Sequence, residues 1–179
     1  MRIIPTLLLL LLLALGAAAQ QSLQEGTTAP EFSAPAMNGQ VFDLNQLQGK
    51  VVVITFWSTK CEICHSEIPK LNQLADRYKG KEVVFLALTM ENETKVENYL
   101  RSTPFNFTIV PNSFGMVMQY ADRDKAGNIN MGFPAYFLVD QTGQIKVKTS
   151  GWDKTPAIDS KISGLLSSPP TTKAVAEKR

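Results

Sequence analysis

The two cysteines and the single histidine of the chain lie within five residues, in the stretch Cys61-Glu62-Ile63-Cys64-His65. Two cysteines separated by two residues have the spacing of a redox-active dithiol. With the histidine that follows, the same stretch also matches the attachment site of a c-type haem. The two chemistries exclude each other, since a protein that moves disulfides needs both sulfurs free to react.

The flanking residues place the cysteines between a strand and a helix. Residues 51–57 form a continuous β-branched and aromatic run, which indicates a strand buried on both faces. Apolar residues at helical spacing then predict a helix over residues 62–78, with Pro69 expected to kink it. A helix N-terminus favours an anion and lowers a cysteine pKa to roughly 3.5–7.5. We therefore expect Cys61 to be the exposed attacking thiol and Cys64, one turn further in, the more buried resolving thiol.

The dithiol is the better supported of the two chemistries. A haem would need His65 as one axial ligand and usually a second histidine or methionine. The methionines of this chain are more simply explained as core residues, and a buried strand–helix–strand unit offers its first helix no haem crevice. A purely structural disulfide is also a poor explanation, because the loop that it closes is too short to stabilise a domain of this size.

The remaining sequence predicts an α/β fold with a mixed central sheet flanked by helices. A second buried strand over residues 83–89 completes a βαβ unit. The other predicted elements are extended pieces around Asn38–Gly39, helices over 91–102, 113–121 and 154–166, an extended segment over 105–110, a polar loop over 122–130, and a hairpin formed by 135–140 and 144–149. We expect the polar loop to border the substrate groove.

The first residues have the features of a secretory signal peptide. A basic start, a leucine run over residues 7–13 and an alanine cleavage site precede Gln20. An uncleaved membrane anchor is the alternative, although the apolar segment is shorter than the about 20 residues that a membrane-spanning helix needs. We therefore divide the chain into a signal segment 1–19, a linker 20–28, a domain 29–166 and a disordered tail 167–179, and we expect a periplasmic or otherwise exported protein. The net charge of +2 is too balanced to indicate nucleic acid or an anionic membrane surface as a partner.

Three stretches together resemble a known family. VVVITFWSTKCEICHSEIPKL and GFPAYFLVDQTGQIKVKTSGW resemble the active-site strand and helix and the cis-proline segment of TlpA/ResA-like thiol-disulfide oxidoreductases. APEFSAPAMNGQVFDLNQLQGK resembles their N-terminal hairpin. The resemblance covers most of residues 29–166 and implies a thioredoxin fold with an N-terminal β-hairpin extension.

The resemblance also implies roles for single residues. Cys61 matches the nucleophile and Cys64 the resolving cysteine of a redox-active disulfide, Cys61–Cys64. Pro134 matches the cis-proline, Phe133 would offer its backbone to an extended substrate, and Trp57 would contribute to the same substrate site.

Two further residues have a chemical and a simpler interpretation. Glu67 matches an acid that transfers a proton to and from Cys64, or it is a surface glutamate. Lys60 stands where many relatives have tryptophan. It either stabilises the Cys61 thiolate or points to solvent.

Family resemblance implies an enzyme that needs no cofactor or metal and acts on disulfide-containing proteins, as similar proteins do in cytochrome c biogenesis. It implies a membrane-borne thiol electron donor and a monomer. We expect reduction of substrate disulfides. A dithiol oxidase or isomerase is the main alternative, and a peroxiredoxin-like peroxidase or a copper-binding protein is weaker, because the cysteine spacing and neighbouring residues fit neither.

Overall fold

The computed structural model describes residues 23–167. The predicted signal segment 1–19 and residues 168–179 of the predicted tail lie outside the described part of the chain. Within residues 23–167, no helix is both long enough and apolar enough to cross a membrane.

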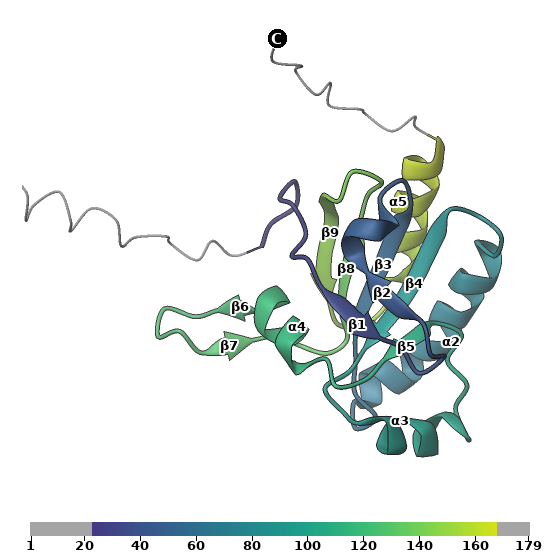
Figure 1. The fold of residues 1–179 in the computed structure, drawn as a ribbon, viewed down its shortest axis with the longest axis vertical. Helices are drawn as coiled ribbons and strands as arrows, with labels where there is room; N and C mark the ends of the chain where they lie inside the picture. The colour runs from purple at the N-terminus through teal and green to yellow at the C-terminus, as the bar shows by residue number, and fades with distance from the viewer. Residues whose placement is uncertain (1–22, 168–179) are drawn as a thin grey trace, which may run out of the picture.

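A five-stranded mixed sheet forms the centre of the molecule, in the order β5-β4-β3-β8-β9 (Figure 1). β3, β4 and β5 run parallel, β8 is antiparallel to β3, and β9 is antiparallel to β8, which confirms the predicted mixed sheet. The elements are β1 (Ser33–Pro35), β2 (Val41–Asp43), η2 (Leu44–Leu47), β3 (Val51–Phe56), α2 (Glu62–Arg77), β4 (Val83–Leu88), α3 (Glu93–Leu100), β5 (Thr108–Val110), α4 (Phe114–Tyr120), β6 (Asp122–Arg123), β7 (Ile129–Asn130), β8 (Ala135–Val139), β9 (Ile145–Ser150) and α5 (Thr155–Ser167).

The side chains of β3 alternate between two hydrophobic clusters, one on each face of the sheet. Val52 and Ile54 belong to the first cluster, and Val51 and Val53 belong to the second. All six residues of the strand are buried. Burial on both faces explains why the strand is a continuous apolar run rather than an alternating one.

The first cluster is covered by the β1–β2 hairpin, η2 and α4. The hairpin turns at the predicted position, where Gly39 has a positive φ of 81°. Asp43 caps η2, because its Oδ1 accepts a hydrogen bond from the Asn45 amide at 2.9 Å. Tyr120 of α4 donates its hydroxyl to the Pro30 carbonyl at 2.7 Å, which ties α4 to the segment before β1.

The second cluster lies under α2 and α5, with Val96 of α3 contributing at its edge. Ile68, Leu71 and Leu74 supply the buried face of α2. The helix begins at Glu62 as expected and ends at Arg77, and Pro69 is accommodated on its exposed side.

The polar segment 122–130 is a β-hairpin and not the loop that the sequence predicts. β6 pairs with β7 antiparallel, and the hairpin projects away from the body of the molecule (Figure 1). Asp124 holds the turn, since its Oδ1 accepts from the amides of Ala126 at 2.8 Å and Asn128 at 2.9 Å. Each strand has two residues and little burial, so no hydrophobic alternation marked it in the sequence.

Candidate active site

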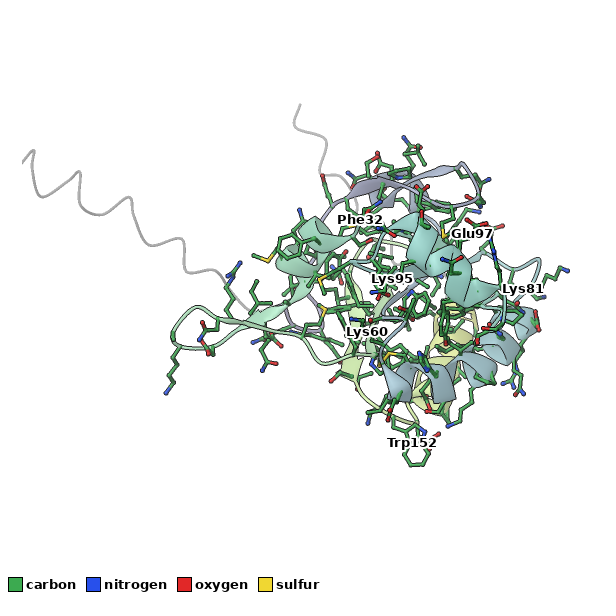
Figure 2. The ribbon with its side chains drawn as sticks, turned by 90° about the horizontal axis from the view of Figure 1, so that it is seen from below. Phe32, Lys60, Lys81, Lys95, Glu97 and Trp152 are labelled. Atoms are coloured by element: carbon green, nitrogen blue, oxygen red, sulfur yellow. A yellow bond between two sulfur atoms is a disulfide. The ribbon has the colours of Figure 1, made fainter. Side chains whose placement is uncertain are left out.

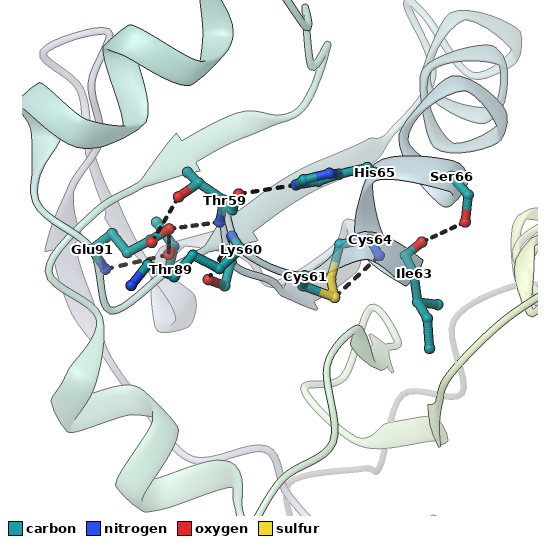
Figure 3. The surroundings of a disulfide bond; sticks show 10 residues. Thr59, Lys60, Cys61, Ile63, Cys64, His65, Ser66, Thr89 and Glu91 are labelled. Atoms are coloured by element: carbon teal, nitrogen blue, oxygen red, sulfur yellow. Dashed lines mark hydrogen bonds between the residues drawn. A yellow bond between two sulfur atoms is a disulfide. The ribbon is translucent and has the colours of Figure 1, made fainter.

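The cysteine pair lies where the chain leaves the sheet and enters α2 (Figure 3). Cys61 is the N-cap residue of α2, and the Cys64 amide donates to Cys61 Sγ at 3.1 Å. The two residues form a disulfide with their Cα atoms 5.2 Å apart. Cys61 is half-buried, whereas Cys64 has 2% of its surface exposed. One sulfur thus lies at the surface, where a helix N-terminus stabilises an anion, and the other is covered.

Phe133 and Pro134 lie at the same end of the sheet. The peptide bond between them is cis. Ala135 pairs with Phe56 across β8 and β3, so Pro134 lies beside the carboxyl end of the strand that leads to Cys61. Pro134 is buried, while Phe133 is half-buried and packs against both clusters.

Glu67 is fully buried although it carries a charge. Its Oε1 accepts a hydrogen bond from Lys70 Nζ at 3.0 Å, and Lys70 also pairs with Asp153 at 2.9 Å. These hydrogen bonds, to Asp153 first and then to Glu67, raise the pKa of Lys70. Glu67 Oε2 is buried and has no hydrogen-bond partner among the described residues. Glu67 follows Cys64 by three residues, which puts the two side chains on the same face of α2.

Two further polar groups are buried on the face of the sheet that α2 covers. Thr55 of β3 pairs in register with Tyr136 of β8, and both hydroxyls lack a partner in the described part of the chain. Burial, together with the charge of Glu67, raises the pKa of Tyr136. Tyr136 is not among the residues predicted for the site, because an aromatic residue in a strand gives no sign of a polar role.

Trp57 and Lys60, both close to Cys61 in sequence, differ in their exposure. Trp57 has 1% of its surface exposed and packs against Tyr99 and Phe105, with ring centroids 5.5 and 5.4 Å away. This burial leaves almost none of the Trp57 surface for a substrate to contact, so we expect Trp57 to support the Cys61 segment from inside the domain. Lys60 is exposed beside Cys61 and lies near the centre of the view in Figure 2, which also shows Trp152 projecting at the edge.

His65 has contacts within the protein. Its Nε2 lies 3.0 Å from the Thr59 carbonyl oxygen, and its ring packs on Tyr99 with centroids 4.9 Å apart. Across residues 23–167, no group of three or more histidine, cysteine or acidic side chains is arranged to hold a metal ion.

The sequence pattern of the redoxin family matches residues 24–166. The chain belongs to this family. Among its relatives, ResA of Bacillus cereus, named a thiol-disulfide oxidoreductase, is 30% identical over 134 residues, covering 74% of this chain and 73% of that protein. ResA of Geobacillus kaustophilus is 32% identical over 127 residues, covering 70% and 69%.

Solved structures agree with this assignment. A putative thiol:disulfide interchange protein DsbE from Chlorobium tepidum superimposes with a TM-score of 0.66 and 26% identity, covering 81% of this chain and 99% of that one. The thioredoxin fold is confirmed, and this redoxin is a TlpA/ResA-like thiol-disulfide oxidoreductase. The choice between dithiol and haem is thereby decided for the dithiol.

Proposed function

We propose that this redoxin is exported and reduces disulfides of extracytoplasmic proteins through Cys61 and Cys64. The observation that carries the proposal is the asymmetry of the pair. Cys61 is half-exposed at the N-cap and accepts a hydrogen bond from the Cys64 amide, while Cys64 is buried one turn further along. In such a pair, one thiolate attacks the substrate and the second thiol stays covered until it attacks the mixed disulfide.

In the first step, the Cys61 thiolate attacks one sulfur of a substrate disulfide. A sulfur–sulfur bond forms between Cys61 and the substrate, and the other substrate sulfur leaves as a thiolate. The amide at the helix N-terminus stabilises the attacking thiolate. Lys60, exposed next to Cys61, adds a positive charge on the approach side.

In the second step, Cys64 loses its proton and attacks Cys61 Sγ. The Cys61–Cys64 disulfide forms, and the second substrate sulfur leaves as a thiolate. Glu67 is the proton acceptor in this proposal. Its buried Oε2 has no partner among the described residues, and it follows Cys64 by one helical turn.

An extended substrate segment would bind along the Phe133–Pro134 segment, whose half-buried Phe133 packs against the hydrophobic cluster that contains Cys64. Substrates are proteins, because a backbone at this position recognises another backbone. A separate membrane-borne thiol donor would reset the disulfide, and the enzyme would act as a monomer. Maturation of c-type cytochromes is one process that such a reductant serves.

The direction of the reaction follows from the compartment. Residues 1–19 have the features of an export signal, and disulfides form readily outside the cytoplasm. Reduction of disulfides in that compartment therefore needs a dedicated reductant. A dithiol oxidase or isomerase would use the same residues in the opposite direction.

The reduction potential of the Cys61–Cys64 pair tests this direction. We expect a value near or below about −270 mV, as for thioredoxin, because a reductant must hold its disulfide more stably than its substrates do. The measurement is an equilibrium of the mature domain with dithiothreitol redox buffers, followed by thiol alkylation. A value close to the about −120 mV of strong oxidants would reverse the proposal and make the protein a disulfide donor.

The β6–β7 hairpin is the second proposed substrate contact. A cavity of about 280 Å³ lies between its base and the sheet, lined in part by Asp122, Met131, Gly132 and Lys148. Gly132 directly precedes the Phe133–Pro134 segment, so a substrate that passes the cysteines continues toward this cavity.

Shortening the hairpin should weaken protein substrates selectively. With residues 123–129 replaced by two glycines, we expect KM for a protein disulfide to rise about tenfold, because about 1.4 kcal/mol of substrate contact is lost. The rate with a small aromatic disulfide should stay unchanged, since it needs only the cysteines. Lys125→Ser, which keeps the hairpin, is the control. Equal KM values for the shortened and the intact protein would remove the hairpin from the substrate site.

A further inference from the structure

The carboxylate of Glu91 binds the short segment that connects β3 to Cys61 (Figure 3). The Thr59 amide donates to Glu91 Oε2 at 2.7 Å, and the Thr59 hydroxyl donates to Oε1 at 2.7 Å. Thr89 donates its hydroxyl to Oε2 at 3.3 Å, and Lys95 Nζ lies 2.7 Å from Oε1. Glu91 is 32 residues from Thr59 along the chain, so this contact bridges two separate loops.

Glu91 is held firmly by the central sheet. It follows β4 closely, and its side chain has 11% of its surface exposed. Its own carbonyl accepts from the Asn112 amide at 2.9 Å, and the Thr89 amide donates to the Val110 carbonyl at 3.0 Å. The carboxylate therefore presents two fixed acceptors to the Cys61 segment.

Thr59 is fixed from its other side by the first turn of α2. His65 Nε2 lies 3.0 Å from the Thr59 carbonyl oxygen, and the Cys61 amide donates to the Ser58 carbonyl at 3.1 Å. Every polar group of Thr59 thus has a partner. These contacts involve neither sulfur atom, so reduction of the disulfide breaks none of them directly.

We propose that Glu91 is a positioning residue that keeps Cys61 at the helix N-cap when the disulfide is reduced. In the oxidised protein, the bond to Cys64 itself holds Cys61. In the reduced protein and in the mixed disulfide, the segment before Cys61 must hold it, and Thr59 is its anchored residue. The proposal rests on the proposed role of Cys61 as the attacking thiol.

Glu91 holds Thr59 through two hydrogen bonds, and its charge is paired with Lys95. Although partial burial raises its pKa, hydrogen bonds from Lys95 and Thr59 outweigh that effect and hold the pKa below its ordinary value. The carboxylate is therefore ionised through the neutral range, and Lys95 balances its charge. Lys60 and Glu62, the charged neighbours of Cys61 in sequence, are unaltered in every variant below.

The test replaces Glu91 and follows the two cysteines separately. In Glu91→Ala, we expect the pH midpoint of Cys61 alkylation in the reduced protein to rise by about one unit, as the thiolate leaves the N-cap. With an aromatic disulfide whose free thiolate is coloured, the first thiolate is released when Cys61 attacks and the second when Cys64 attacks the mixed disulfide. We expect the second release to slow about tenfold, because the two sulfurs are less well aligned.

Three variants separate positioning from stability and charge. Glu91→Gln keeps an acceptor for the Thr59 amide and should restore much of the second release. Lys95→Met removes the ion pair but neither Thr59 bond, and should behave as the parent protein. Thr59→Val removes only the hydroxyl donor and should shift both readouts less than Glu91→Ala, so the proposal stays testable if the alanine variant does not fold.

An unchanged pH midpoint and an unchanged second release in folded Glu91→Ala, or in Thr59→Val if the alanine variant does not fold, would overturn the positioning role. Peptide mapping of the parent protein distinguishes this failure from a failure of the proposed function. If Cys64 is alkylated before Cys61, the assignment of the attacking thiol is wrong whatever Glu91 does.

Discussion

Cys64→Ser is expected to turn the protein into a covalent trap for its substrates. Cys61 can still attack a substrate disulfide from the helix N-cap, but no second thiol lies within reach to release the product. The lifetime of the mixed disulfide should lengthen about 10³-fold or more, because a positioned thiol acts at a very high effective concentration. Folding should persist, since a disulfide between residues three apart adds little stability.

Non-reducing electrophoresis of extracts from cells that make the Cys64→Ser variant should show adducts that dithiothreitol removes. With an aromatic disulfide whose free thiolate is coloured, the variant should release about one thiolate per protein, against about two for the parent. Cys61→Ser is the matched control and should form no such adducts at Cys64, which is covered. Adducts at Cys64 in that control, or turnover by Cys64→Ser, would contradict the division of roles between the two cysteines.

Glu67→Gln is expected to slow the resolving step by about 10²-fold near neutral pH, the usual contribution of a positioned acid or base. The glutamine fills the same volume but cannot accept the Cys64 proton. The attack by Cys61 should be unchanged, because that thiol is half-buried at the helix N-cap whereas Glu67 is fully buried. Lys70 keeps its bond to Asp153 and is partly exposed, so the loss of the charge on Glu67 leaves no buried unpaired cation.

Stopped-flow measurement of the two thiolate releases separates the steps. The first release should match the parent protein, and the second should carry the whole effect. Glu62→Gln is the control, since Glu62 is an exposed carboxylate in the first turn of the same helix. If Glu67→Gln resolves as fast as the parent, the buried carboxylate has a structural role and another group takes the proton.

The location of the cysteines could be predicted because local patterns determine it. The run from Val51 to Phe56 has no polar alternation, so it indicates a strand covered on both faces. Helical spacing begins directly after it, so Cys61 falls at an N-cap and Cys64 one turn later. The strand, the helix and the helix N-cap all depend on residues that are close in the sequence. The strand–cysteine–helix unit can therefore be predicted without tertiary information.

The roles of the polar side chains could not be predicted in the same way. Glu62 and Glu67 lie on one helix, and only the rotation of α2 against the sheet exposes the first and buries the second. Trp57 is buried because it packs against Tyr99 and Phe105, although its place beside the cysteines suggested a substrate contact. The strands of the 122–130 hairpin pair through backbone hydrogen bonds, and segments of two residues are too short to show a strand pattern in the sequence.

The sequence by itself determined which two sulfur atoms form the disulfide and where they lie, because the two cysteines, the preceding strand and the following helix are contiguous in the chain. Only the tertiary structure decided what surrounds those atoms. Glu91 meets Thr59 from 32 residues away, and Tyr136 meets Thr55 through strand register. Contacts of this kind depend on how the elements pack against one another. That packing is set by burial over the whole domain and not by any short stretch of residues.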